Sequence, residues 1–133
     1  MPESFLVIDD SKLLHQMYRL IFSQGDLAGS TVHYAVNGRE GYALLAAHPE
    51  LTLVLLDLNM PEMNGLEVLA RRQTEHLHPQ VPIALVTTEA SEEDEARGRA
   101  VGAWDYLRKP FQPSDIQALV RRAREKRRSR GAA

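Results

Sequence analysis

Short apolar runs typical of β-strands alternate with amphipathic, helix-like segments along the whole chain, in about five repeats. Such alternation is the pattern of a parallel sheet whose faces are covered by helices. The run from Leu51 to Leu56 has no regular alternation of polar residues, which indicates a central strand buried on both faces. We therefore expect an α/β fold with a doubly wound parallel sheet.

Capping and helix-breaking residues predict the element boundaries. Five strands are expected, at residues 5–8, 31–35, 51–56, 81–86 and 105–108. Helices are expected to start at Asp10 or Ser11, Asn37, Asn64, Ser91 and Pro113. In the first helix, the spacing predicts one apolar stripe made of Leu14, Met17, Tyr18 and Ile21. Gly98 lies within the fourth helix at a cost of about 1 kcal/mol relative to alanine, so we expect that helix to be weak.

The composition is that of an ordinary globular domain, with 44% hydrophobic and 26% charged residues among 133. This length accommodates one folded domain, which we expect at residues 1–124, followed by a basic tail at 125–133. No apolar run approaches the roughly 20 residues that span a bilayer, and the N-terminus does not resemble a signal peptide. We therefore expect a cytoplasmic protein with no membrane partner. The chain lacks cysteine, which removes disulfides and thiolate sites.

The net charge of −2 conceals an uneven distribution. Between residues 121 and 130, seven basic residues stand against Glu125, which gives +6 and leaves −8 on residues 1–120. Cations in the last turns of a terminal helix favour its dipole and keep it solvated. No nucleic-acid reader motif accompanies these charges, so we do not expect nucleic-acid binding.

Four of the apolar runs end at a polar or charged residue. Asp9 and Asp10 follow the first strand and Asp57 the third, Thr87 follows the apolar run of the fourth, and Lys109 follows the fifth. Parallel strands place their carboxyl ends at one edge of the sheet, where open α/β sheets bind ligands. Helix capping explains any one of these residues but not the whole set.

Asp9, Asp10 and Asp57 would bring three carboxylates together, and their mutual repulsion favours a bound cation. An open site with oxygen ligands suits Mg²⁺, which keeps several waters and accepts one or two carboxylates together with phosphate. We expect Asp10 and Asp57 to be direct ligands, and Asp9 to bind directly or through water. The backbone carbonyl of Asn59 would supply another oxygen.

Asp57, at the end of the central strand, is the candidate nucleophile that takes a phosphoryl group as an acyl phosphate. Phosphoryl transfer needs positioning and charge stabilisation, for which Lys109 supplies a cation and Thr87 a hydroxyl donor. The bond between Lys109 and Pro110 is a candidate for a cis peptide that aims the lysine.

With these motifs, the chain resembles the receiver domain of bacterial two-component response regulators, and most of all the stand-alone chemotaxis type, CheY. The resemblance covers residue 5 to about residue 124. It is carried by Val7-Ile8-Asp9-Asp10-Ser11, Leu55-Leu56-Asp57-Leu58-Asn59-Met60-Pro61 with Asn64-Gly65, Val86-Thr87-Thr88-Glu89-Ala90 and Asp105-Tyr106-Leu107-Arg108-Lys109-Pro110-Phe111. It implies the flavodoxin-like (βα)5 fold with strand order 2-1-3-4-5.

The resemblance also implies the roles of the site residues. Asp57 would accept a phosphoryl group from a sensor histidine kinase or a histidine phosphotransfer protein. Asp9 and Asp10 would be the Mg²⁺ acids, and Thr87 and Lys109 would contact the phosphoryl group.

Tyr106 matches the family's switch aromatic. In the family's mechanism, Thr87 moves toward the phosphoryl group and Tyr106 turns inward to fill the vacated space. The face formed by the fourth helix, fifth strand and fifth helix then changes its preference for a downstream protein. Trp104 lies at the start of the fifth strand on this face and is a candidate partner anchor, although burial in its own domain explains it equally well.

Three residues flank the acceptor and are expected to tune it. Thr88 stands where the family commonly has alanine or glycine, so its extra methyl and hydroxyl should slow both phosphorylation by small donors and hydrolysis. By resemblance, Asn59 and Glu89 tune the lifetime of the phosphoryl group.

Two further groups of residues are considered for partner and metal binding. Kinase specificity in the family resides on the first helix, here at Leu14, His15 and Tyr18. The pair His76 and His78 has a spacing that a metal could use, but histidines beside a proline turn are commonly surface residues. None of the five histidines is therefore assigned a role in the site.

The leading interpretation is a single-domain response regulator that catalyses only its own phosphorylation and dephosphorylation. One alternative is a shuttle that passes the phosphoryl group to a histidine phosphotransfer protein. Another is a Mg²⁺-dependent phosphohydrolase with Asp57 as nucleophile, which needs a second acid where this chain has Asn59. A scaffold that binds without phosphorylation and a receiver excised from a longer regulator complete the alternatives.

Overall fold

The computed structural model describes residues 3–88 and 91–132, the last three of them as backbone only. Its strands form one parallel sheet in the order β2-β1-β3-β4-β5. The strands are β1 (Ser4–Ile8), β2 (Thr31–Ala35), β3 (Leu53–Leu56), β4 (Ile83–Thr87) and β5 (Asp105–Arg108). The predicted fold class and strand order are confirmed.

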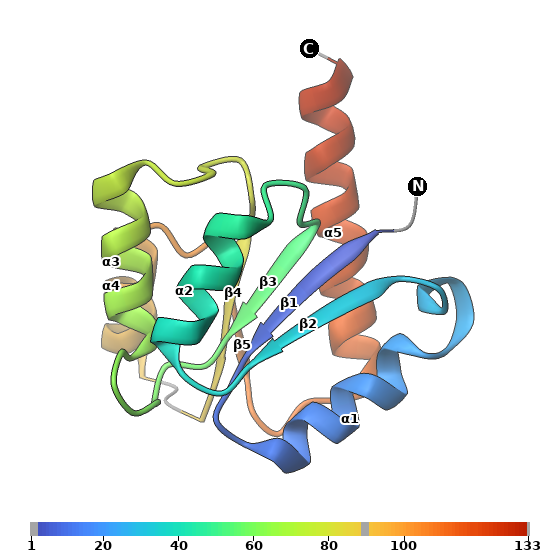
Figure 1. Ribbon diagram of the computed structural model, residues 1–133, viewed down its shortest axis with the longest axis horizontal. Coiled ribbons are helices and arrows are strands. Elements are labelled where there is room, and N and C mark those ends of the chain that lie inside the picture. Colours follow the sequence, from blue (N-terminus) through green and yellow to red (C-terminus); the bar gives the residue numbers. More distant parts are fainter. Residues whose placement is uncertain (1–2, 89–90, 133) are drawn as a thin grey trace.

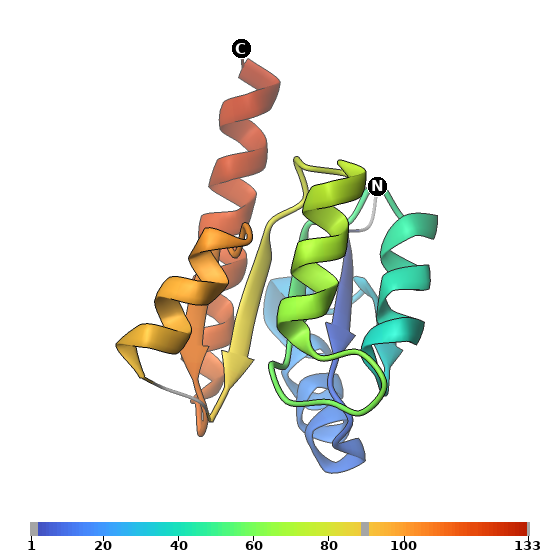
Figure 2. The ribbon, with the colours of Figure 1, turned by 90° about the vertical axis from the view of Figure 1, so that its left-hand side faces the viewer.

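Helices cover both faces of the sheet (Figure 1, Figure 2). They are α1 (Lys12–Phe22), α2 (Gly38–Ala47), α3 (Gly65–Glu75), α4 (Glu92–Ala100) and α5 (Pro113–Ala132), with a short 3-10 helix η1 (Gly25–Leu27). α1 and α5 pack on one face, and α2, α3 and α4 on the other. Successive residues of β1 alternate between these two cores: Phe5 and Val7 belong to the first, Leu6 and Ile8 to the second.

Side-chain caps begin four helices where the sequence predicts them. In each case a side-chain oxygen accepts a hydrogen bond from the backbone amide three residues on, and the caps are Ser11, Asn37, Asn64 and Ser91. Of the two candidates at α1, Ser11 is therefore the cap and Asp10 is left for other interactions. At α3, Glu67 completes a capping box by accepting from the amide of Asn64 at 3.2 Å.

Gly98 has a packing role that its helix propensity does not reveal. α4 forms on both sides of this residue, and Gly98 is buried against the sheet. A Cβ atom here would lie 2.5 Å from Cδ1 of Leu85 in β4. The absence of a side chain lets α4 approach β4 closely, which accounts for a glycine within a helix.

α5 continues across the boundary predicted between residues 124 and 125, and its far end projects beyond the sheet (Figure 1). Arg124 pairs with Glu3 and, at 2.6 Å, with Asp26. Arg127 donates to Oγ1 of Thr52 at 3.0 Å. Basic residues of this helix thus tie it to the segments that precede β1 and β3. Among the described helices, none is long and apolar enough to cross a membrane.

Gly65, the first residue of α3, lies against the backbone that follows β3. A Cβ atom there would lie 2.5 Å from the carbonyl oxygen of Asp57 and 2.9 Å from Cα of Leu58. Because these backbone atoms cannot move aside cheaply, we expect Gly65→Ala to lower the free energy of unfolding by about 2 kcal/mol. Urea unfolding measures this change.

Gly98→Ala is the matched control for this prediction. Its new methyl meets the end of a side chain, and alanine gains about 1 kcal/mol of helix propensity. The loss of stability should therefore be clearly smaller than for Gly65→Ala, and equal losses would contradict the argument.

Candidate functional site

Backbone pairing continues beyond the strands at the carboxyl edge of the sheet. The amide of Asp57 donates to the carbonyl of Ile8 at 2.9 Å, and the amide of Lys109 donates to the carbonyl of Thr87 at 2.9 Å. Residues that follow different strands are therefore held in register with their neighbours. This pairing brings the predicted site residues to one edge of the sheet.

Asp9, Asp10 and Asp57 form the predicted acidic cluster. Each offers one carboxylate oxygen, and the three oxygens lie within 4.8 Å of one another. Asp9 and Asp57 are buried, whereas Asp10 is exposed, so the cluster opens to solvent at Asp10. The amide of Ser11 donates to Oδ1 of Asp9 at 2.8 Å and orients that carboxylate. Hard oxygen ligands in an open cluster fit the coordination that Mg²⁺ prefers.

Lys109 supplies the positive charge beside this cluster. Its Nζ lies 2.7 Å from Oδ2 of Asp9 and 3.5 Å from Oδ1 of Asp57. The peptide bond between Lys109 and Pro110 is cis. One ammonium group thus faces two buried carboxylates, and with Asp10 the ionised cluster keeps a net negative charge.

The carboxyl group of Asp57 has a raised pKa. Burial is the largest cause; Lys109 acts in the opposite direction, and the charges of Asp9 and Asp10 raise the pKa further. A hydrogen bond from the backbone of Asn59 lowers it. Folding therefore disfavours the ionised form of Asp57, and an additional cation in the cluster would reduce this free-energy penalty.

His15 is a buried neighbour of the site that the sequence analysis missed. Its Nε2 lies 2.7 Å from the carbonyl oxygen of Asp9, so this nitrogen carries the proton and donates it to the carbonyl. Its ring packs on Tyr34, with the centroids 5.1 Å apart. His15 precedes Tyr18 by three residues, which places both on the buried face of α1, and this spacing was the available signal.

The predicted switch and tuning residues differ in exposure. Thr87 is fully buried. Tyr106 is half-buried, its ring packs on the core shared with α2 and α3, and its hydroxyl oxygen is buried. Thr88 and Asn59 are exposed, and Glu89 lies outside the described residues. Tyr106 therefore has an inward orientation in this structure.

The exposed residues of α1 differ from those predicted. His15 and Tyr18, two of the expected specificity residues, are buried and cannot contact a partner protein. The large apolar side chains that α1 exposes are Leu13, Met17 and Leu20, here called the α1 stripe. Met17 was also wrongly predicted to belong to the core-facing stripe, since it is 43% exposed. Leu13, Met17 and Leu20 are four and three residues apart, so they lie together on a different face of the helix.

Trp104 is half-buried and packs against the core that α1 and α5 cover. The guanidinium carbon of Arg122 lies 5.7 Å from the centroid of its ring, within reach of a cation–π interaction. Contacts within the domain thus explain why part of the Trp104 side chain is buried. Its role as a partner anchor stays a prediction.

The comparison with known proteins agrees with this fold. Residues 5–121 match the response regulator receiver domain family, and the chain belongs to it as a CheY-like receiver domain of a two-component response regulator. The transcriptional regulatory protein SrrA of Staphylococcus aureus is 32% identical over 126 residues, which cover 92% of this chain and 49% of SrrA. The chain thus spans about half the length of the curated relatives it matches.

Two solved structures extend the comparison. The chemotaxis protein CheY4 of Vibrio cholerae has 32% sequence identity and a TM-score of 0.81, over 92% of this chain and 99% of the CheY4 chain. A CheY-like receiver domain protein of Methanospirillum hungatei has 25% identity and a TM-score of 0.83, over 97% of this chain and 99% of that chain. The family, the CheY-like fold and the strand order expected from the sequence are thereby confirmed.

The raised pKa of Asp57 predicts that Asp57→Asn stabilises the protein when chelator removes metal ions. Above the folded-state pKa, ionised Asp57 lowers the free energy of unfolding, so the variant should be more stable than the parent at neutral pH. The gain should shrink as the pH falls through the raised pKa and be lost below the ordinary value of 3.8, where both states are protonated. Denaturant unfolding against pH measures it.

Glu62→Gln, which removes one exposed carboxylate, is the control for this series. It should show no comparable gain. Asp57→Asn leaves Lys109 paired with Asp9 at 2.7 Å, so no buried cation is stranded. A variant less stable than the parent at every pH would contradict the prediction.

Proposed function

We propose that this chain is a phosphoaccepting switch in which Asp57 receives a phosphoryl group from a histidine kinase or a histidine phosphotransfer protein. The observation that supports this best is Lys109, whose Nζ lies 2.7 Å from Asp9 and 3.5 Å from Asp57. The ion pair of Lys109 with Asp9 is shorter than its ion pair with Asp57. Of the two buried carboxylates, Asp57 is therefore the one that is less tightly bound and better able to attack phosphorus.

The transfer makes one bond and breaks one bond. A carboxylate oxygen of Asp57 attacks phosphorus and forms an O–P bond while the P–N bond of the donor imidazole breaks and its electron pair returns to nitrogen. The carboxylate needs no general base. Lys109 stabilises the charge on the phosphoryl oxygens, and the hydroxyl of Thr87 donates a hydrogen bond to them.

Asp9, Asp10 and Asp57, with the backbone carbonyl of Asn59, are the residues that would hold Mg²⁺. When bound, the ion supplies positive charge to the carboxylates and to the phosphoryl oxygens. The exposure of Asp10 leaves room for the waters that Mg²⁺ keeps. Outside its own phosphorylation and dephosphorylation, we assign the chain no catalysis.

Thr87 and Tyr106 would carry the signal to the face formed by α4, β5 and α5. The buried Thr87 ends β4, and Tyr106 lies on the neighbouring strand β5, opposite Leu85 in the parallel pairing. The chain can adopt the inward orientation of the Tyr106 side chain. Phosphorylation therefore needs only to favour this orientation over the other orientations of that side chain. The changed face would then bind a downstream protein.

Two alternatives differ from this switch. A shuttle would use the same Asp57 chemistry but return the phosphoryl group to a histidine. A phosphohydrolase needs an acid two residues after the nucleophile, and Asn59, exposed at that position, cannot donate a proton to a leaving group. We therefore favour the switch.

Phosphorylation by acetyl phosphate tests the proposal. We expect a single phosphoryl adduct in the intact mass, formed with Mg²⁺ and absent with chelator. Asp57→Ala should lose it, whereas Glu62→Ala, at an exposed site, should keep it. In the same assay, Thr88→Ala should react and hydrolyse severalfold faster if the Thr88 side chain narrows access. An adduct that persists in Asp57→Ala would refute the assignment of the acceptor.

The α1 stripe would be the docking surface for the phosphohistidine donor. Leu13 and Leu20 are 70% and 62% exposed, so their apolar area is available for burial against a helix of the donor. With a kinase that phosphorylates the parent chain, the double variant Leu13→Ser, Leu20→Ser should slow transfer about tenfold, equivalent to about 1.4 kcal/mol of binding. Its rate with acetyl phosphate should stay unchanged. An unchanged rate of transfer from the kinase would exclude the α1 stripe as its docking surface.

A further inference from the structure

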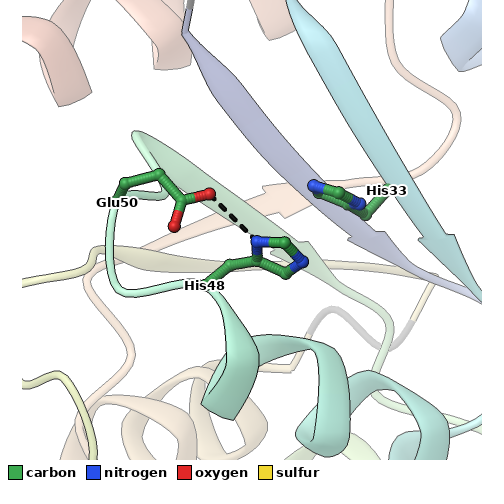
Figure 3. A group of neighbouring side chains, drawn as sticks. All are labelled: His33, His48 and Glu50. Atoms are coloured by element: carbon green, nitrogen blue, oxygen red, sulfur yellow. Dashed lines mark hydrogen bonds and ion pairs between the residues drawn. The ribbon is translucent and has the colours of Figure 1, made fainter.

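His33, His48 and Glu50 lie together beside the first strands of the sheet (Figure 3). His33 belongs to β2, His48 is the C-cap of α2, and Glu50 lies in the turn that leads toward β3. Each offers one ligand atom, and these atoms lie within 4.8 Å of one another. The strand β2 and the turn after α2 thus bring two imidazoles and one carboxylate together.

The distances are close to those of a metal site. Ligand atoms at 2.0–2.2 Å from a tetrahedral zinc ion lie roughly 3.3 Å apart. Nδ1 of His48 is hydrogen-bonded to Oε2 of Glu50 at 3.0 Å, so this pair already has nearly that separation, and a metal ion would replace the proton between them. The rings of His33 and His48 are stacked, with centroids 4.0 Å apart and an angle of 26° between their planes. Because the lone pair of a ring nitrogen lies in the ring plane, binding one ion through both imidazoles requires His33 to rotate out of this stack.

The surroundings favour ligand binding by these side chains. The hydroxyl of Ser4 donates to Oε2 of Glu50 at 3.2 Å, an outer contact of the kind that orients metal ligands. Arg127 donates to the backbone carbonyl of Glu50. His33 is half-buried, so packing limits the freedom of its ring. Glu50 is exposed, so water can reach a fourth coordination position.

This cluster is separate from the acidic cluster in position and in chemistry. His33 pairs with Leu6 in the middle of β1, and Ser4 begins that strand, whereas Asp9 follows its end. Imidazole ligands suit zinc and its neighbours among the transition metals, whereas carboxylates and water suit magnesium. The two sites should therefore select different ions.

We propose that His33, His48 and Glu50 form a binding site for a divalent transition metal, represented by Zn²⁺, with water as the fourth ligand. The ion would join the edge strand β2 to the end of α2 and to the turn before β3. Because it binds the folded chain and joins β2 to the turn after α2, it would stabilise the fold.

Calorimetric titration with Zn²⁺ tests this site. The full chain carrying Asp57→Asn is the parent, since this substitution breaks up the acidic cluster while Asp9 stays paired with Lys109. We expect one Zn²⁺ per chain. Adding His33→Gln or His48→Gln should weaken binding at least about 100-fold, the upper end of what the loss of an outer contact costs. His76→Asn, which replaces an exposed histidine, should leave affinity unchanged.

Imidazole NMR signals and thermal unfolding complete the test. Zinc should shift the signals of His33 and His48 together, leave that of His76 in place, and raise the unfolding temperature of the parent but not of the His48→Gln chain. Circular dichroism without zinc establishes whether each variant is folded. If a histidine variant does not fold, Glu50→Gln, which changes an exposed carboxylate, replaces it in the test and should likewise weaken zinc binding. Parental zinc affinity in the histidine variants, or no binding by the parent, would overturn the proposal.

Discussion

The shared direction of the five strands is the constraint on which the rest of the structure depends. In a parallel sheet, every strand delivers the residue that follows it to the same edge, whereas antiparallel neighbours would deliver theirs to opposite edges. Asp9 and Lys109 are 100 residues apart in the sequence, yet their side chains meet at 2.7 Å. The helices on both faces permit this arrangement, because each returns the chain to the start of the next strand.

The two buried carboxylates at this edge differ in how closely their partners hold them. Lys109 lies 0.8 Å closer to Asp9 than to Asp57, as the distances of 2.7 and 3.5 Å give. His15 and the amide of Ser11 add further contacts to Asp9, one to its carbonyl and one to its carboxylate. The carboxylate of Asp9 is therefore held more closely by its neighbours than that of Asp57.

Strands, caps and the residues at strand ends could be predicted because they depend on local patterns. A run of apolar residues, a serine before a helix and an acid after a strand are each visible within a few positions. Which way a helix side chain points depends on how the helix lies on the sheet, so His15 and Met17 were assigned to the wrong faces. The meeting of His33 with His48 depends on the packing of β2 against α2, which no local pattern contains.

α5 differs from the other helices in reaching well past the sheet that it covers (Figure 1). Its 20 residues give a rod of roughly 30 Å. Ile116 and Val120 seat the first half in the core, and Arg124 fastens the middle to Glu3 and Asp26. Because the helix is one continuous rod, any tilt of its seated half would displace the distant end further than the end in the core.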